Sequence, residues 1–455
     1  MDRPIADQTF GSTVIRECSL RSGRGRPDLI RLQASDPQRY PGLFLSSGDA
    51  GWDILFAFPQ AVSRITVADG LAGLQSQPAM RLRPTPSRSA PGLPFSGGWL
   101  CAFSYELGGL FEPSAGRAAD DADFPLAWLM RIPAAILFDR ANRRCVLVAE
   151  TGQTDLLECM QRDLDSTPPP LQAVPELLDL SEDDPETFLS GVLRIQDYIR
   201  AGDVFQANLS RGWQAAFAQP VPAATLFSRL MQRNPAPFSA LLQMDEWAIV
   251  SSSPERLVRL GADGLLETRP IAGTHPRSED AAEDAALRAC LQAHPKERAE
   301  HVMLVDLERN DLGRVCEPGS VEVAALMEIA SYRHVHHIES TVRGRLRSGM
   351  RVFDALRAVF PGGTITGCPK VRTMQIIREL EQTPRRCYTG SVGYINHDGS
   401  FDFNILIRSF LLRGSEVRFR AGAGIVADSI ATRELEETRA KARGLLRALE
   451  PGNDN

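Results

Sequence analysis

Residues 391–425 read SVGYINHDGSFDFNILIRSFLLRGSEVRFRAGAGI, and this stretch decides the fold class of the chain. Its apolar runs predict three strands in succession, at Ser391–Ile395, Phe403–Leu412 and Val417–Ala421. A predicted helix over Ala431–Leu449 comes only after the third strand. Because strands follow one another with no helix between them, the pattern favours a mixed or antiparallel α+β core over a parallel doubly wound sheet.

The same pattern extends back through the second half of the chain. A helix is predicted from about Pro185 to Ala201, because Leu189, Val192 and Ile195 recur at helical spacing and Gly202 provides a stop. Further strands are predicted near Val204–Ser210, Ala248–Ser252, Leu257–Arg259 and Leu265–Arg269, and further helices over Pro295–Leu307 and Val371–Leu380.

The stretch Ser166–Glu186 is rich in proline and acidic residues, a composition typical of a connector between two halves of a chain. It divides the chain into an N-terminal region, residues 1–165, and a candidate catalytic domain, residues 187–450. The first half carries strand-like apolar runs at Leu43–Ser46, Ile54–Phe58, Trp99–Tyr105, Ala134–Asp139 and Cys145–Glu150.

Composition narrows the class of protein. The 455 residues carry a net charge of -6, which argues against a nucleic-acid or membrane-surface partner. No apolar run has the length of a membrane span, and the first 20 residues lack the apolar region of a signal peptide. Eight scattered cysteines without a CxxC pair indicate a reduced, cytoplasmic protein. Lysine occurs only at Lys296, Lys370 and Lys441, so these positions are of interest.

Two pairs of carboxylates have the spacing of a helix face. Glu297 and Glu300 lie three residues apart on one predicted helix, and Glu434 and Glu437 repeat this spacing on the last one, with Lys441 one turn further. Two such pairs facing each other would hold a hard cation such as Mg²⁺. Two separate solvated helix faces are the alternative, and the sequence alone leaves both open.

Two loops are candidates for ligand contact. PGGTITGCPK, residues 361–370, leads into a helix, and a helix N-terminus suits a carboxylate or phosphate; a plain tight turn is the alternative. Gly422 and Gly424 end a predicted strand and allow a ligand close to the backbone. A match of residues 422–427 to a dinucleotide fingerprint lacks the required helix and βαβ unit, which excludes a nicotinamide enzyme.

Histidine and glutamate supply candidate acids and bases. His334, His336 and His337 cluster, and one catalytic acid with two structural histidines is favoured over a metal cluster. Glu255 follows an X-Pro break and is a candidate acid or base, although pairing with an arginine is the plainer reading of this residue taken alone.

Taken in chain order, seven segments resemble the chorismate-utilising enzymes. They are SPER, TRPIAGT, ERAEHVMLVDLERNDLGRV, HHIEST, PGGTITGCPKVRTM, GSVGYI and AGAGIVADS. The family includes anthranilate synthase component I, aminodeoxychorismate synthase component I, isochorismate synthase and salicylate synthase. The resemblance is strong from about residue 187 to 450 and weaker in the first half, through LPFSGGW. It implies a two-lobed mixed or antiparallel sheet core with flanking helices, as in anthranilate synthase component I.

The resemblance also implies roles for individual residues. Glu300 and Glu437 would bind Mg²⁺, with Glu297 and Glu434 beside them, and the metal would hold the ring carboxylate of chorismate. His337 matches the general acid for the departing ring hydroxyl, and Glu255 matches the glutamate near it. The remaining substrate contacts match Arg408, Tyr394, Gly422, Gly424, Thr364, Thr366 and Lys441.

Three further catalytic positions bear on the product. Gln206 stands where isochorismate synthases carry a water-activating lysine, which argues against isochorismate or salicylate formation. Ala272 and Thr274 belong to PIAGT, as in anthranilate synthases, whereas the better-known aminodeoxychorismate synthases have PIKGT, whose lysine attacks ring carbon 2. Against this, Asn208 and the segment APFSA, residues 236–240, resemble the aminodeoxychorismate branch, and FLSS, residues 44–47, replaces the LLES of tryptophan feedback.

The sequence therefore favours amination of chorismate to 4-amino-4-deoxychorismate, for 4-aminobenzoate and folate synthesis. Anthranilate formation is the alternative, and a non-catalytic chorismate- or tryptophan-binding regulator is a third hypothesis. No glutaminase motif is visible, so ammonia is expected from a separate glutamine amidotransferase subunit.

Overall fold

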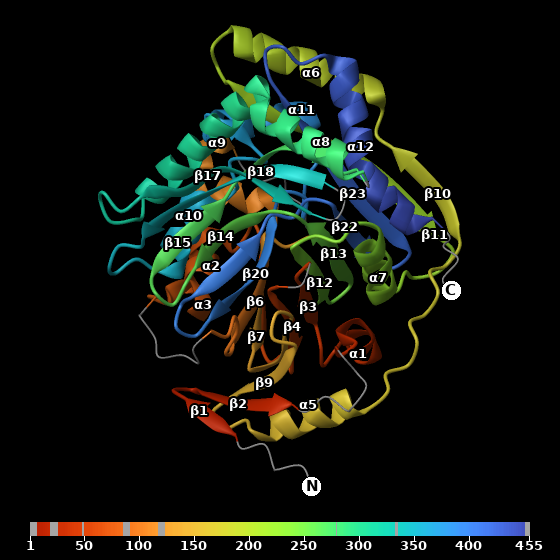
Figure 1. Ribbon diagram of the computed structural model, residues 1–455, viewed down its shortest axis with the longest axis vertical. Coiled ribbons are helices and arrows are strands. Elements are labelled where there is room, and N and C mark those ends of the chain that lie inside the picture. The colour runs from red at the N-terminus through yellow and green to blue at the C-terminus, as the bar shows by residue number, and fades with distance from the viewer. Residues whose placement is uncertain are drawn as a thin grey trace.

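The computed structural model describes residues 7–18, 26–47, 50–84, 92–116, 123–278, 280–332 and 335–450, and the side chains of 274–276 and 296 lie outside this description. Two antiparallel sheets form its centre, and helices cover their outer faces (Figure 1). The expected mixed α+β core is confirmed.

The first sheet has 13 strands among the described residues. In spatial order they are β1 (Gln8–Phe10), β2 (Thr13–Cys18), β9 (Arg144–Glu150), β8 (Ala134–Asp139), β4 (Trp52–Ala57), β3 (Gly42–Leu45), β12 (Phe238–Met244), β13 (Trp247–Ser253), β22 (Ser409–Arg413), β23 (Glu416–Ile425), β11 (Gln206–Phe217) and β10 (Leu177–Glu182), with β19 (Gly367–Cys368) also on β11.

The second sheet has ten strands in the described part of the chain. Their order is β16 (Ile271–Pro276), β18 (Val335–Arg345), β15 (Leu265–Arg269), β14 (Arg256–Leu260), β21 (Phe401–Asn404), β20 (Ser391–Asn396), β6 (Gly98–Phe103), β7 (Ala127–Ile132) and β5 (Val62–Ile65), with β17 (Glu322–Ser331) also on β18. Both sheets draw strands from either side of residues 166–186.

Alternating side chains of the strands fill three apolar layers, as the two-residue period of a strand requires. Phe56 and Leu100 pack between the two sheets. Their chain neighbours point the other way, Leu55 under the helices of the first sheet and Cys101 under those of the second. The result is a stack of helices, sheet, sheet and helices.

The helices group at distinct places. α6, α8, α9, α11 and α12 gather at one end, and α5 lies at the opposite end beside β1 and β2 (Figure 1). The α-helices are α1 (Leu29–Ser35), α2 (Gly70–Ser76), α3 (Pro78–Arg81), α4 (Gly108–Phe111), α5 (Asp155–Asp165), α6 (Pro185–Arg200), α7 (Ala223–Arg233), α8 (Ala281–Ala293), α9 (Pro295–Gly313), α10 (Val352–Val359), α11 (Lys370–Glu381) and α12 (Ala431–Leu449). Among the described helices, none is both long and apolar enough to cross a bilayer.

Two sequence predictions need correction. The single strand expected at Phe403–Leu412 is two strands, β21 and β22, which belong to different sheets. Between them, directly before β22 begins, Arg408 has φ of 52°, a left-handed conformation that is incompatible with a continuous strand. The connector at residues 166–186 also contains a strand, β10, because its backbone pairs with β11. Apolar patterning cannot reveal either feature, since both depend on distant backbone partners.

Candidate active site

The site lies where β11 and β23 run side by side and α9 approaches them. The amide nitrogen Nε2 of Gln206 donates a hydrogen bond to Oε1 of Glu300, at 2.7 Å. A Cβ on Gly424 would lie 2.4 Å from that nitrogen and 3.4 Å from Oε1 of Glu300. Glycine at 424 is therefore what lets the α9 carboxylate reach the sheet.

The predicted carboxylates of α9 and α12 lie within electrostatic reach of each other. Burial raises the pKa of Glu300, and the negative charges of Glu297 and Glu437 raise it further, against the opposing effects of Gln206 and Lys441. Glu434, also on α12, is buried. The carboxylates of the two helices therefore influence one another's ionisation, and their joint binding of one ion stays a prediction.

The glutamate carboxylates of α9 and α12 are the candidate ligands of a magnesium ion. Among the described residues, no three His, Cys, Asp or Glu side chains form a ready-made metal cage. Mg²⁺ usually takes only one or two protein carboxylates and completes its octahedron with water and substrate oxygens. Crowded negative charge around the partly buried Glu300 fits such an ion, with Glu300 and Glu437 as the groups that would hold it.

Lys441 connects α12 to β23. Its Nζ donates to the carbonyl oxygen of Gly422 at 3.1 Å and lies 2.7 Å from Oε1 of Glu437. Both side chains of the ion pair are about half exposed, 44% and 47% of their surface, so the pair adds little to stability. Its effect is to orient the Glu437 carboxylate toward the sheet.

His337 on β18 lies beside the PIAGT turn. Its Nδ1 is 3.1 Å from the carbonyl oxygen of Gly273, so Nδ1 carries the hydrogen and Nε2 is the nitrogen that can take a proton. Burial, with the positive charge of Arg408, lowers the pKa of His337 to about 4. A Cβ on Gly273, where φ is 68°, would lie 2.9 Å from Oε2 of Glu297. The turn, the histidine and α9 thus meet at Gly273.

Ala272 is buried on β16 opposite Ile338, so no nucleophilic side chain is present at that position. Thr274 pairs through its backbone with His337, while its side chain lies outside the described residues.

Glu255 and Arg408 interact electrostatically, and Arg408 also acts on His337. Burial raises the pKa of Glu255 to about 8, against an interaction with the Thr364 hydroxyl. Burial also lowers the pKa of Arg408, and Glu255 offsets part of this effect. Arg408 has φ of 52°, and a strained backbone of this kind is typical of functional positions.

The PGGT loop is fastened to α9 and is not a free anion cradle. Lys370 Nζ pairs with Asp311 and donates to the carbonyl oxygen of Val359 at 3.0 Å. Thr366 is fully buried, and its hydroxyl donates to the carbonyl oxygen of Gly362 at 2.8 Å. The Thr364 hydroxyl interacts with Glu255, and the Thr366 hydroxyl bonds within the loop; substrate contact by either residue stays a prediction.

Known proteins with similar sequences show the family to which this chain belongs. The family model for chorismate binding enzymes matches residues 41–447. The chain belongs to this family. Aminodeoxychorismate synthase component 1 of Bacillus subtilis (strain 168) is 41% identical over 371 residues, 78% of this chain and 77% of that protein. Anthranilate synthase component 1 of the same strain is 38% identical over 389 residues, 80% of this chain and 75% of that protein.

The fold comparison agrees with the sequence comparison. Anthranilate synthase component I from Streptococcus pneumoniae TIGR4 superposes with a TM-score of 0.75 at 31% identity, covering 88% of this chain and 93% of that one. Relatives with either product name are thus similar to this chorismate-binding enzyme to about the same degree, so their names do not decide the product.

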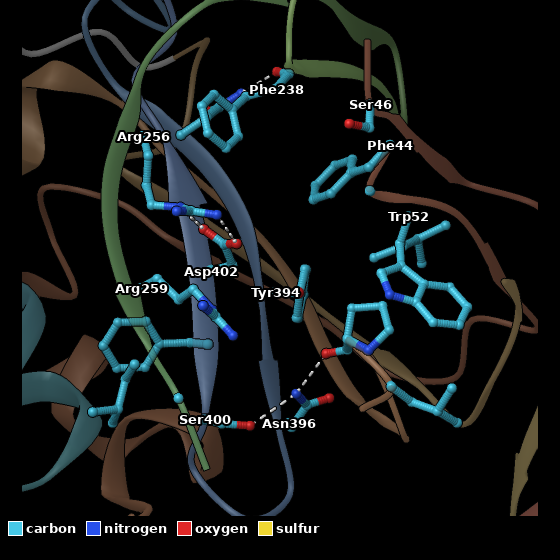
Figure 2. A pocket seen from close by; sticks show the side chains of 18 of the residues that line it. Phe44, Ser46, Trp52, Phe238, Arg256, Arg259, Tyr394, Asn396, Ser400 and Asp402 are labelled. Carbon is cyan, nitrogen blue, oxygen red and sulfur yellow. Dashed lines mark hydrogen bonds and ion pairs between the residues drawn. The ribbon is translucent and has the colours of Figure 1, made fainter. Parts of the chain in front are cut away.

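Tyr394, which the sequence placed with Arg408, lies elsewhere. It lines a cavity of about 770 Å³ between the two sheets, with its ring 6.2 Å from that of Phe44. Figure 2 shows Phe44 and Trp52 on one side of this cavity and Arg256 and Arg259 on the other. The reason is strand alternation, because Val392, Tyr394 and Asn396 of β20 all face the cavity.

Tyr388 is the tyrosine that the site contains and that sequence reasoning missed. It is buried in the turn before β20, where a Cβ on Gly422 would lie 2.9 Å from its hydroxyl and 2.7 Å from Oδ1 of Asn208. Tyr388 lies two residues before the GSVGYI segment, so the motif drew attention to the wrong tyrosine. Only its proximity to Gly422 in the folded chain distinguishes Tyr388 from Tyr394.

The other histidines of the cluster are structural where they are described. Nε2 of His336 lies 3.0 Å from Oδ1 of Asp284, and Nδ1 lies 2.8 Å from the Ser331 hydroxyl. His334 lies outside the described residues. The described histidines fit the expectation of one catalytic acid beside a structural neighbour.

Proposed function

We propose that this chorismate-binding enzyme aminates chorismate to 4-amino-4-deoxychorismate, with Mg²⁺ and with ammonia from a separate glutaminase subunit. The observation that carries the proposal is the convergence of buried polar groups on the two glycines of β23. Glu300 and Gln206 meet at Gly424, and Asn208 and Tyr388 meet at Gly422. Asn208 supports the aminodeoxychorismate branch because it resembles the residue of that branch, and its buried Oδ1, which has no partner among the described residues, is available to a ligand.

Glu300 and Glu437 would hold the magnesium ion, with Glu297 and Glu434 beside them. When bound, the ion supplies positive charge for the ring carboxylate of chorismate. The carboxylates of α9 and α12 would hold the ion, and Lys441 orients the Glu437 carboxylate through their ion pair.

Protonation of the departing ring hydroxyl falls to His337 and Glu255. Burial and, after it, the charge of Arg408 lower the pKa of His337, so a substrate carboxylate on Arg408 would offset the second of these effects and favour a proton on Nε2. Glu255, with a pKa of about 8, keeps its proton at neutral pH and can donate a hydrogen bond to the same oxygen. Both groups would thus assist cleavage of the carbon–oxygen bond.

Ala272 excludes a nucleophile from the protein at the PIAGT position. A small molecule admitted to the site would therefore add at ring carbon 2 as the hydroxyl leaves carbon 4. Ammonia would then add at carbon 4 and expel the carbon 2 adduct, which leaves aminodeoxychorismate without any enzyme-linked intermediate.

The second candidate function is anthranilate formation, and Ala272 is the observation that favours it. If ammonia itself adds at carbon 2 and stays there, loss of the enolpyruvyl group gives the aromatic 2-amino acid. A non-catalytic chorismate-binding regulator remains a third reading.

The test is to identify the product from chorismate, Mg²⁺ and ammonium with the purified protein. We expect a product that an added aminodeoxychorismate lyase converts to 4-aminobenzoate, and intact-mass analysis during turnover should show no adduct on the protein. Fluorescent anthranilate as the sole product would establish the second candidate. Chorismate binding without turnover would establish the regulator. Glutamine should replace ammonium only after a glutaminase subunit is added.

A further inference from the structure

His301 follows Glu300 on α9 but points away from the proposed ion site. Its ring is completely buried, and its Nε2 lies 2.6 Å from the hydroxyl oxygen of Ser340 on β18. Ser340 comes three residues after His337 on the same strand. One hydrogen bond therefore joins the helix that carries Glu300 to the strand that carries His337.

The Ser340 hydroxyl makes a second contact that fixes it in place. It accepts a hydrogen bond from the backbone nitrogen of Met327 at 2.9 Å. Met327 lies in a bulge of β17 and has φ of 53°, a conformation that a non-glycine residue adopts only where its surroundings hold it. The backbone nitrogen of Ser340 also donates to the carbonyl oxygen of Pro270 at 3.2 Å, two residues before Ala272.

Ser340 is thus the point at which α9, β17, β18 and the PIAGT segment are tied together. The two groups joined through it, the Glu300 carboxylate and the His337 imidazole, must act on opposite ends of one substrate in the proposed reaction. A shift of about 1 Å between such groups is enough to cost roughly 100-fold in rate. Neither His301 nor Ser340 needs to touch the substrate to have this effect.

We infer that His301 is a positioning residue, which acts through Ser340 to hold the carboxylates of α9 in register with His337. This inference rests on the proposed function, because it concerns the same magnesium and acid groups. Residues that orient metal ligands from behind commonly change metal affinity or activity by about 10- to 100-fold when they are removed. The inference therefore makes a kinetic prediction that a merely structural histidine would not.

The test uses a matched pair of variants at one position. His301→Gln keeps an amide nitrogen near the place of Nε2, whereas His301→Met has similar length and no hydrogen-bonding group. With the full-length protein, we expect His301→Met to raise the Kd for Mg²⁺ about 10-fold, measured by calorimetry with chorismate and without ammonium, and to lower kcat with ammonium about 10-fold. His301→Gln should restore most of both, and the chorismate KM at saturating Mg²⁺ should change little.

Ser340→Ala provides an independent route to the same measurement. It removes the hydroxyl, so it should reproduce the His301→Met kinetics, and the double variant should be no worse than either single variant because both remove one linkage. Val302→Ala, at an exposed neighbour on α9, is the control and should leave every constant unchanged.

The outcomes separate the inference from the proposed function. If the wild-type protein does not turn over chorismate, the proposed function fails. If the wild type is active and folded His301→Met and Ser340→Ala retain kcat and the Kd for Mg²⁺ within about twofold, His301 is only structural and the inference is wrong. If either variant does not fold, the other variant and His301→Gln still decide the matter.

Discussion

The active site and the cavity around Tyr394 are both assembled from distant parts of the chain, but they treat buried polar groups differently. In the cavity, Arg256 makes paired contacts with Asp402 at 3.0 and 3.1 Å, and the Asn396 amide donates to Pro94 and Ser400. In the active site, Oε1 of Gln206 and Oε1 of Glu255 are buried and have no partner among the described residues.

The difference shows that cavity size is a poor guide to chemistry in this fold. The large cavity is lined by aromatic rings, and its polar groups named above are already satisfied. Buried polar groups are ordinarily hydrogen-bonded, and an unsatisfied one costs about 1–3 kcal/mol. Such groups persist in the active site because a bound substrate or ion can satisfy them.

The largest expected effect comes from removing one carboxylate charge at the proposed ion site. Glu300→Gln or Glu437→Gln should abolish nearly all turnover, with folding intact, because Mg²⁺ requires hard charged oxygen ligands. Asp402→Asn removes a carboxylate from the cavity and should leave turnover within about threefold, since it alters only a structural ion pair. Steady-state rates with circular dichroism as the folding check decide the matter. Near-normal turnover in either glutamate variant would show that these carboxylates do not hold the ion.

A smaller effect is expected at Lys441. Lys441→Arg keeps the charge but cannot reproduce the compact contacts of Nζ with Glu437 and the Gly422 carbonyl, so kcat/KM should fall about 10-fold. Lys296→Arg, at the start of α9, should stay within about twofold. Equal tolerance at both positions would show that the scarcity of lysine in this chain carries no functional information.

The two tyrosines test the comparison most directly. Tyr388→Phe removes a hydroxyl next to Gly422 and should raise the KM for chorismate about 10-fold, the loss of roughly one hydrogen bond to a charged group. Tyr394→Phe changes only the cavity and should shift that KM by less than about twofold. If Tyr394→Phe had the larger effect, the cavity would be part of the active site, and Tyr394 rather than Tyr388 would be the substrate-binding tyrosine.

The smallest expected effect is on stability and concerns Glu255. Its folded pKa of about 8 lies above the ordinary value of 4.5, so the folded protein loses stability as pH rises from about 4.5 through 8. Glu255→Gln cannot lose a proton, so its unfolding free energy relative to wild type should increase over that range, by roughly 1–4 kcal/mol. Urea denaturation at pH 5, 7 and 8.5 measures the trend, and a constant difference would contradict it.

Sequence reasoning succeeded where local pattern determines structure. α12 begins and ends where the helical spacing predicted. Sequence reasoning failed where contacts with distant parts of the backbone determine the local structure. The split at Arg408 depends on which sheet each strand joins, and the bulge at Met327 depends on Ser340. Tyr388 had no periodic signal, because it lies in a turn.

The position of the last hairpin has a consequence for how the chain is made. β22 and β23 lie between β13 and β11, two strands that are synthesised roughly 160 and 200 residues earlier, respectively. Until residue 425 leaves the ribosome, β13 and β11 each keep one long unpaired edge, and such edges readily pair with other chains. Any product of premature termination would therefore be an aggregation hazard, and a cell under translational stress would need a chaperone to shield this gap in the sheet.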